Sequence, residues 1–524
     1  MINITTVNGF LTKIDQKLEV IKFRPAPYLI LIIIVGFSLR MFYFPHDLPI
    51  TLDGLQYFWY AMDMSVLKQF PSGYIIPNNG WPTFVSVFFS LYNSNNYLDY
   101  MYIQRLLSIT ISVLTVIPVY FLCRRFFSVT YSLIGATFVI FEPRLVINSL
   151  SGITESSYIL LGATTLFFIL SNKIKYTYVA FGVAALFTLV RYEGVLLIIP
   201  ISIMFLIKFR KEKKIVLKYL AALCMFLVII TPMAYIRMET SKDGHDGIVS
   251  HAIIAGPQYY KNTLDEETGQ ERIFQMFTKS ITYFTQYLGW VLIPLFVFFV
   301  PIGTILIFKN RDLKNLTIIL VSIIFFIPAL YAYSRGIQDT KYFYVMYPIF
   351  SIVALYGITK IDNKFRKPNI IWLLVIIFIF SSSILFLSFK DFNYERELES
   401  FKIAELVVVN AKGVNDHYPE SKYYFVSELS EYKFPTLSSS VSTGPILFAT
   451  EGFGSLEEFI ERYRDQGLTH LVVDNSEKRP DFLHRVFLDE KSYPYLIKEF
   501  DSHENGFTYY VKVYRINYDE FDHK

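Results

Sequence analysis

Long runs of apolar residues recur along the chain and are separated by short polar segments. The first run covers about residues 27–44, and similar runs continue to about residue 389. A helix rises about 1.5 Å per residue, so a run of about 20 residues crosses a hydrocarbon core of about 30 Å. The pattern therefore predicts a mainly α-helical polytopic membrane protein with about eleven transmembrane helices in residues 1–389.

The pattern changes after residue 389. Residues 390–524 are more polar, and alternating apolar and polar positions over 423–427, 470–474 and 509–515 predict short strands. Residues 404–411 and 457–466 have the spacing of amphipathic helices. The sequence therefore predicts a small C-terminal α/β domain outside the membrane.

The first polar loop, at about residues 45–100, is long and holds two short apolar segments, 55–70 and 81–92. The first segment is interrupted by Gln56, Asp63 and Lys68, and is therefore too polar to cross a bilayer. We expect it to form an interfacial helix that places aromatic side chains such as Tyr57 at headgroup depth. A second long outer loop is predicted at about residues 237–280.

The charged residues sort between alternate loops. Basic residues gather in the N-terminal segment and in loops 124–125, 173–175, 208–214, 309–314 and 360–367. The intervening loops hold few Lys or Arg. Because positively charged loops stay cytoplasmic, we expect a multi-pass protein of the cell membrane, with a cytoplasmic N-terminus and an extracytoplasmic C-terminal domain.

Composition adds little to this picture. The chain is 53% hydrophobic and its mean hydropathy is +0.38, as expected for a membrane protein. The net charge of +4 is small, and we expect lipids rather than nucleic acid as partners. Cys123 and Cys224 both fall in predicted spans, which suggests neither a disulfide framework nor a zinc site.

Ionisable residues gather at the predicted outer ends of the spans. Such groups are costly near a bilayer and usually face a cavity or a partner. We therefore expect one outward-facing cleft that contains both carboxylates and cations. The candidate residues are Asp53, Arg105, Glu155, Arg191, Glu193, Arg335 and Lys341, with Tyr57 beside Asp53.

This mixture suits the transfer of a sugar from a phosphate carried by a membrane lipid. The phosphate is already a good leaving group, so the reaction needs one base for the acceptor and positive charge for the departing phosphate. A single displacement inverts the configuration of the sugar, whereas a retaining hydrolase needs two carboxylates about 5–5.5 Å apart.

Several stretches, taken in order, resemble the GT-C membrane glycosyltransferases. They are similar to family 39, the protein-mannosyltransferase-like and ArnT-like group of archaeal or bacterial type. The stretches are 53–60, 105–108, 119–127, 154–155, 191–194 and 341–348. The resemblance implies a polyprenyl-phosphate sugar as donor, Asp53 as catalytic base, and contacts of Arg335 and Lys341 with the lipid phosphate. The acceptor (protein, lipid or glycan) and the class of sugar, hexose or pentose, stay open.

The chain also departs from the family pattern. Many protein mannosyltransferases carry an acidic pair in the first loop, but here Gly54 follows Asp53. Oligosaccharyltransferases of this superfamily use a divalent metal. A metal held by Asp53 and Glu155 stays open, although no ligand spacing supports it.

Several candidate residues also have a structural interpretation that competes with a role in function. Glu155 places negative charge on the first turn of a helix, and Arg191 and Glu193 have the spacing to pair across a turn. Arg335 and Lys341 have side chains long enough to reach lipid headgroups without binding substrate. The competing functions are a transporter or flippase of a lipid-linked sugar, and an assembly scaffold.

Overall fold

The computed structural model describes residues 25–74, 78–240, 269–310, 312–365, 368–390, 392–427 and 444–523. These residues form two compact units. The first comprises Met1–Phe44, Phe70–Phe84 and Arg105–Lys390, and the second comprises Pro45–Gln69, Val85–Gln104 and Asp391–Lys524. The second unit thus combines two pieces of the first loop with the C-terminal region, a grouping that composition did not indicate.

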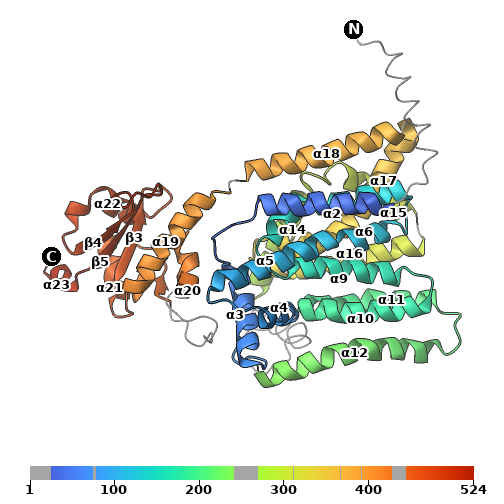
Figure 1. Cartoon of the computed structure of the whole chain (residues 1–524), viewed down its shortest axis with the longest axis horizontal. Helices are drawn as coiled ribbons and strands as arrows, with labels where there is room; N and C mark the ends of the chain where they lie inside the picture. Colours follow the sequence, from blue (N-terminus) through green and yellow to red (C-terminus); the bar gives the residue numbers. More distant parts are fainter. Residues whose placement is uncertain are drawn as a thin grey trace, which may run out of the picture. The chain divides into compact units, whose positions relative to one another are not determined.

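The first unit is a bundle of helices. In chain order they are α2 (Pro25–Phe42), α6 (Val116–Cys123), α7 (Val129–Ile140), α8 (Pro143–Ser149), α9 (Glu155–Ile169), α10 (Ile174–Val190), η1 (Tyr192–Leu197), α11 (Ile198–Lys208), α12 (Ile215–Thr240), α14 (Gly269–Leu292), α15 (Phe299–Lys309), α16 (Leu313–Ser334), η3 (Thr340–Met346), α17 (Tyr347–Phe365) and α18 (Pro368–Phe389). Two further helices, α4 (Gly80–Leu91) and α5 (Tyr97–Leu114), begin in one unit and end in the other. Helix α10 contacts both α9 and α12, and the three run side by side (Figure 1).

Six helical segments among the described residues are long and apolar enough to cross a membrane, or seven if the bent pair α7 and α8 forms one span. Four further apolar helices are shorter. The predicted polytopic membrane fold is confirmed, while the number of about eleven spans stays a prediction. The apolar run at about residues 282–308 is divided into α14 and α15, and Pro294 lies in the break. Proline has no N–H to continue a helix, which accounts for the division.

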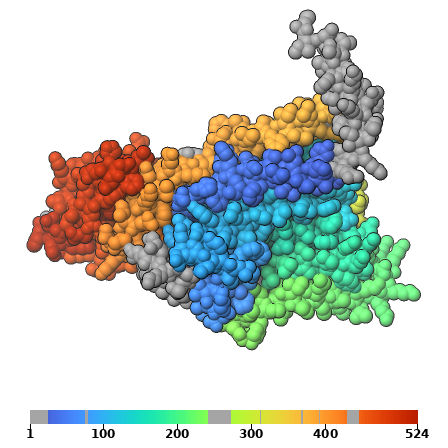
Figure 2. Space-filling model, viewed as in Figure 1, coloured from blue at the N-terminus to red at the C-terminus, as the bar shows by residue number. Residues whose placement is uncertain are grey.

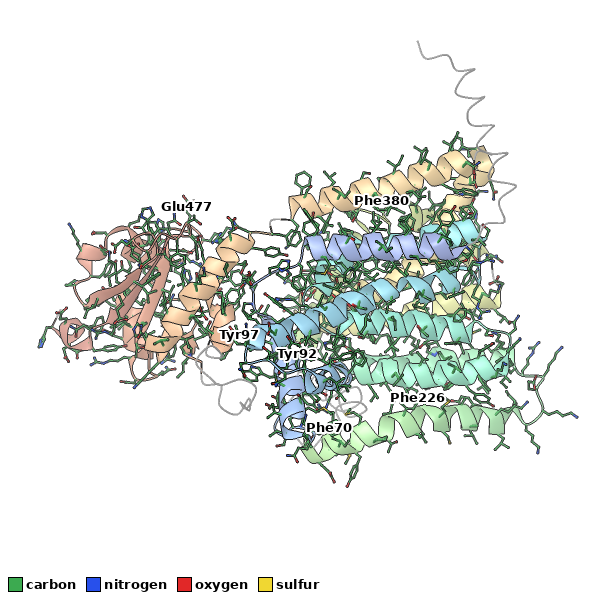
Figure 3. All side chains as sticks on the ribbon, viewed as in Figure 1. Phe70, Tyr92, Tyr97, Phe226, Phe380 and Glu477 are labelled. Atoms are coloured by element: carbon green, nitrogen blue, oxygen red, sulfur yellow. The ribbon has the colours of Figure 1, made fainter. Side chains whose placement is uncertain are left out.

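Apolar side chains cover the outside of the bundle as well as its interior. On α2, Ile30, Leu31 and Ile34 are each more than half exposed, and this helix lies open at the surface (Figure 2). On α17, by contrast, most residues are buried. Side chains fill the space between the helices of the unit (Figure 3), where Phe380 of α18 packs against Phe141. This distribution is what a protein surrounded by lipid requires, because apolar side chains cost nothing at its surface.

The C-terminal part of the second unit holds a five-stranded sheet of order β2-β1-β3-β5-β4. The strands are β1 (Gly413–Asn415), β2 (Ile446–Phe448), β3 (His470–Asp474), β4 (Leu496–Asp501) and β5 (Val511–Ile516). Strand β1 pairs in parallel with β2 and β3, and β5 pairs antiparallel with β3 and β4. The helices are α19 (Tyr394–Asn410), η4 (Glu420–Tyr423), α20 (Tyr424–Ser427), α21 (Leu456–Arg464), α22 (Asp481–Leu488), η7 (Glu490–Ser492) and α23 (Tyr518–Asp522).

Helices α21 and α22 supply much of the core of this domain. Phe459 of α21 and Leu483 of α22 pack with Leu471 and Val473 of β3. The predicted small α/β domain is therefore confirmed, including a strand over 470–474. The predicted strand over 423–427 is wrong, because this segment forms η4 and α20. Five residues are too few for an alternating pattern to separate a strand from a helical turn.

The first loop contributes α3 (Leu52–Leu67) to the second unit, together with the parts of α4 and α5 that lie in it. The predicted helix after Asp53 is present, but its aromatic side chains are buried within the unit. Phe58 packs edge-on against Phe89 of α4, which in turn packs against Tyr100 of α5. Tyr57 is also buried. Of the predicted outer loop 237–280, residues 241–268 lie outside the described part of the chain.

Candidate functional site

The first unit contains a pocket of about 360 Å³, a volume that includes space open to solvent. Four of the seven charged residues that the sequence singled out line it, together with aromatic and aliphatic side chains. The lining residues are Glu155, Tyr158, Ile159, Arg191, Glu193, Phe325, Pro328, Lys341, Tyr342 and Val345. They come from α9, the turn after α10, α16 and η3.

Arg191 joins the two carboxylates of the pocket. It lies between α10 and η1 with extended backbone angles, so that its side chain leaves the helix axis. Its Nη1 is 2.5 Å from Glu155 Oε1, and its Nη2 is 2.8 Å from Glu193 Oε1. Its Nε also donates to Glu193 Oε2, at 3.4 Å. The planar guanidinium thus holds Glu193 with two donors and Glu155 with a third, which fixes both carboxylates.

Aromatic rings surround this ion pair. The guanidinium carbon of Arg191 lies 5.6 Å from the ring centre of Tyr158 and 5.9 Å from that of Tyr342. Tyr158 stacks on Phe187, with ring centres 3.9 Å apart. Contacts of this kind limit the rotation of the guanidinium and of the tyrosine rings, so the pocket has fixed walls.

Two carboxylates, Glu155 and Glu193, line the pocket together with two cationic side chains, Arg191 and Lys341. Lys341, at the edge of the pocket, has its Nζ 3.4 Å from Asp339 Oδ2. The pocket therefore presents carboxylate oxygens, which accept hydrogen bonds from hydroxyl or amino groups, next to an ammonium group that attracts an anion.

The other predicted site residues lie elsewhere. Asp53 is exposed in the first turn of α3, and Tyr57 is buried in the same helix; both belong to the second unit. Arg105 is buried in α5 and donates through Nε to the carbonyl oxygen of Leu150, at 3.0 Å. Arg335 is exposed where α16 ends. Neither arginine is among the residues that line the pocket.

Sequence reasoning missed another buried cation, Arg40 of α2. It is completely buried and donates to Ser112 Oγ, Ser149 Oγ and the carbonyl oxygens of Gly36 and Ile140. These bonds tie α2 to α5, α7 and α8. The signal was present in the sequence, because an arginine inside an apolar run marks a specific interaction.

The described residues do not fit a protein-held metal. No group of three or more His, Cys, Asp or Glu side chains among them is arranged to hold one. Glu155 and Glu193 are instead occupied by Arg191. The pair that the sequence left open, Asp53 and Glu155, belongs to two different units, so a divalent ion held by both stays a prediction.

A family model described as dolichyl-phosphate-mannose-protein mannosyltransferase matches residues 97–236. The structure is similar to ArnT from Cupriavidus metallidurans bound to undecaprenyl phosphate, with a TM-score of 0.55 and 9% identity over 93% of this chain and 98% of that one. This chain has the GT-C glycosyltransferase fold. The resemblance inferred from the sequence is therefore confirmed.

Two structures of the Archaeoglobus fulgidus oligosaccharyltransferase share this GT-C fold. One, in complex with Zn and sulfate, has a TM-score of 0.54 and 13% identity, over 85% of this chain and 68% of that one. The other, AglB with an inhibitory peptide and a dolichol-phosphate, has a TM-score of 0.50 and 12% identity, over 86% and 69% of the two chains. No curated protein sequence matches this chain. The matched range 97–236 includes Glu155, Arg191 and Glu193 but neither Asp53 nor Lys341.

Proposed function

We propose that this protein is an inverting glycosyltransferase. It moves a hexosyl or pentosyl group from a polyprenyl-phosphate donor to a protein, lipid or glycan acceptor on the outer face of the membrane. The observation that carries the proposal is the pocket in which Arg191 holds Glu155 and Glu193 beside Lys341. The family match and the GT-C fold support it, and two of the similar structures hold undecaprenyl phosphate or dolichol-phosphate.

The groups that line the pocket match the chemistry of the sugar and the phosphate of such a donor. Carboxylate oxygens fixed by Arg191 accept hydrogen bonds from sugar hydroxyls, and the faces of Tyr158 and Tyr342 pack against the apolar C–H groups of the ring. Arg191 itself is paired with two carboxylates, so it has little charge to offer an anion. We therefore assign the phosphate to Lys341, at the edge of the pocket.

Asp53 is the proposed base. It lies in the first turn of α3, where the helix dipole favours a negative charge. The preceding residue, Leu52, has φ = 53°, a left-handed conformation that is uncommon for a leucine and costs free energy. Buried Gln104 donates through Nε2 to the carbonyl oxygen of Gly54, at 3.0 Å. A strained, braced turn of this kind is typical of a residue held for a function.

The reaction is a single displacement. Asp53 accepts the proton from the acceptor hydroxyl or amine as that group attacks the anomeric carbon. The bond between the anomeric carbon and the phosphate oxygen breaks, and the polyprenyl phosphate leaves with the electron pair. Attack opposite the leaving group inverts the configuration of the sugar.

Asp53→Asn tests the proposal. Purified protein is incubated with a panel of polyprenyl-phosphate sugars, and released lipid phosphate is measured by mass spectrometry. We expect turnover to fall at least about 100-fold, because general base catalysis typically contributes that much. The matched control is Asp99→Asn, which removes a first-turn carboxylate of α5 in the same unit.

Full activity of Asp53→Asn on the true donor would show that another group is the base. Movement of a lipid-linked sugar across liposome membranes without release of lipid phosphate would contradict the transferase proposal and favour a flippase.

A further inference from the structure

A short segment of the first loop touches both turns that carry the carboxylates of the pocket. This segment, Asn78-Asn79-Gly80-Trp81, is called the clamp below. It belongs to the first unit, like the pocket. Its residues carry no periodic signal, and nothing in the sequence connects them with Glu155 or Arg191.

Asn78 holds the turn of Arg191 and Glu193. Its Oδ1 accepts a hydrogen bond from the backbone N–H of Tyr192, at 3.1 Å, and its side chain is largely buried. Tyr192 is the first residue of η1, where backbone N–H groups have no partner inside the helix. Asn78 therefore caps η1 from a distant part of the chain and fixes the residue between the two charged side chains.

Trp81 holds the other turn. Its Nε1 donates to the carbonyl oxygen of Gly152, at 2.9 Å, and its indole is 1% exposed. Gly152 has φ = 68°, and three residues later α9 begins with Glu155. The hydrogen bond therefore fixes the backbone from which the first carboxylate of the pocket projects.

Gly80 and Asn79 complete the clamp. A Cβ at Gly80 would lie 2.5 Å from the carbonyl oxygen of Leu189, so the clamp backbone packs directly on the last turn of α10. Asn79 accepts a hydrogen bond from Arg237 Nη1 of α12, at 2.9 Å. The clamp therefore contacts α10, α12, η1 and the turn before α9.

We propose that Asn78 and Trp81 are positioning residues that hold the two carboxylate-bearing turns at the separation that Arg191 bridges. Arg191 reaches Glu155 and Glu193 only while both turns keep their places, because a guanidinium has a fixed geometry. The structural part of this inference depends on contacts alone. Its consequence for donor binding rests on the proposed function.

Hydrogen–deuterium exchange of the full chain in lipid nanodiscs tests the clamp without any assay of activity. Asn78→Ala should speed exchange at the Tyr192 amide about five- to tenfold, since one hydrogen bond is lost. Trp81→Phe keeps an aromatic ring but removes the donor, and should speed exchange over residues 151–157. Asn78→Asp keeps the acceptor oxygen and should restore protection at Tyr192.

Two matched controls distinguish a local effect of the clamp hydrogen bonds from a general increase in exchange. Asn96 Oδ1 also accepts a backbone N–H, that of Leu98, at 3.0 Å. Asn96→Ala should therefore speed exchange at Leu98 and leave Tyr192 unchanged. Trp290 is almost half exposed on α14, and Trp290→Phe should leave residues 151–157 unchanged. The proposal would be overturned if the Tyr192 amide stayed equally protected in Asn78→Ala. It would also be overturned if Asn96→Ala lowered the protection of that amide by the same amount.

Kinetics then test the consequence for the donor. With an active donor identified, Asn78→Ala should raise KM for that donor about tenfold, and Asn78→Asp should recover most of the loss. An unchanged KM, despite faster exchange at Tyr192, would overturn the role of the clamp in donor binding. If wild-type protein turns over no donor, the proposed function fails, whereas the exchange data still decide whether the clamp exists.

Discussion

The pocket of the first unit and a buried cluster in the C-terminal domain use similar charged groups in opposite settings. In the cluster, His417 Nδ1 is 2.7 Å from Glu420 Oε2, and His417 Nε2 is 3.3 Å from Asp474 Oδ2. Arg479 Nη2 is 2.8 Å from Asp474 Oδ2. His417, Glu420 and Asp474 are completely or almost completely buried. Glu155 and Arg191 are also largely buried, but together with Glu193 they line a pocket.

The two sites differ in whether their charged groups border a pocket. The cluster has two carboxylates against one guanidinium and one imidazole, so it is neutral when His417 is protonated. Burial alone would lower the pKa of His417, but Glu420 and Asp474 outweigh burial and raise it. Burial alone would likewise raise the pKa of Asp474, but His417 and Arg479 hold it well below its usual value. The cluster is closed off within its domain, whereas the charged groups of the first unit line a pocket, which makes them candidates for ligand binding.

The largest effect on stability is expected from Asp474→Asn. It leaves buried His417 and partly exposed Arg479 facing only Glu420. Removal of one partner from a buried ion pair costs about 3–5 kcal/mol, so the free energy of unfolding of the C-terminal domain should fall by about that amount. Pulse proteolysis of the full chain measures the change. Asp465→Asn, at an exposed position, is the control, and an equal loss in both variants would contradict the assignment.

Arg191→Met should give a smaller loss of stability and a larger loss of activity. Water entering the pocket can solvate Glu155 and Glu193, so we expect a loss of only about 2 kcal/mol. Donor turnover should fall at least about 100-fold, because both carboxylates lose their orientation. Arg191→Lys keeps the charge without the planar fork and should recover stability better than turnover. Unchanged turnover in Arg191→Met would show that the pocket does not serve the reaction.

The cluster also predicts how stability depends on pH. The pKa of His417 is higher in the folded domain than in the unfolded chain, where it is about 6.5. Its contribution is therefore complete below about pH 6.5 and is lost as the pH rises through the folded value. Unfolding of the C-terminal domain, followed by pulse proteolysis between pH 6 and 9, should become easier as the pH rises. His417→Gln should flatten this dependence, and an equally steep profile in that variant would exclude His417 as its origin.

The comparison also separates what the sequence could predict from what it could not. Apolar runs predict membrane helices because the bilayer imposes their length. Charges at the predicted outer ends of these runs indicated Glu155, Arg191, Glu193 and Lys341. The structure brings these four around one pocket, while their roles stay predictions. The relation of Asp53 to that pocket also stays a prediction, because Asp53 belongs to the second unit.

Other features depend on contacts between distant parts of the chain. Asn78 and Tyr192 are 114 positions apart, and His417 and Asp474 belong to different elements of a small sheet domain. No local pattern distinguishes these residues from other polar residues in loops. Only packing brings them together, so a single sequence does not reveal them.

The smallest effect on stability is expected from Lys341→Met. Lys341 and Asp339 are both partly exposed, and such a pair contributes less than about 1 kcal/mol. The free energy of unfolding should therefore change by no more than about 0.5 kcal/mol.

If Lys341 contacts the donor phosphate, Lys341→Met should raise KM for the donor about fivefold or more. The rise should be smaller at high salt, because salt screens the attraction. Lys360→Met, at an exposed position near the other end of α17, should change neither quantity. A KM unchanged by Lys341→Met would show that this lysine does not bind the donor, and the phosphate would then need another partner than Lys341.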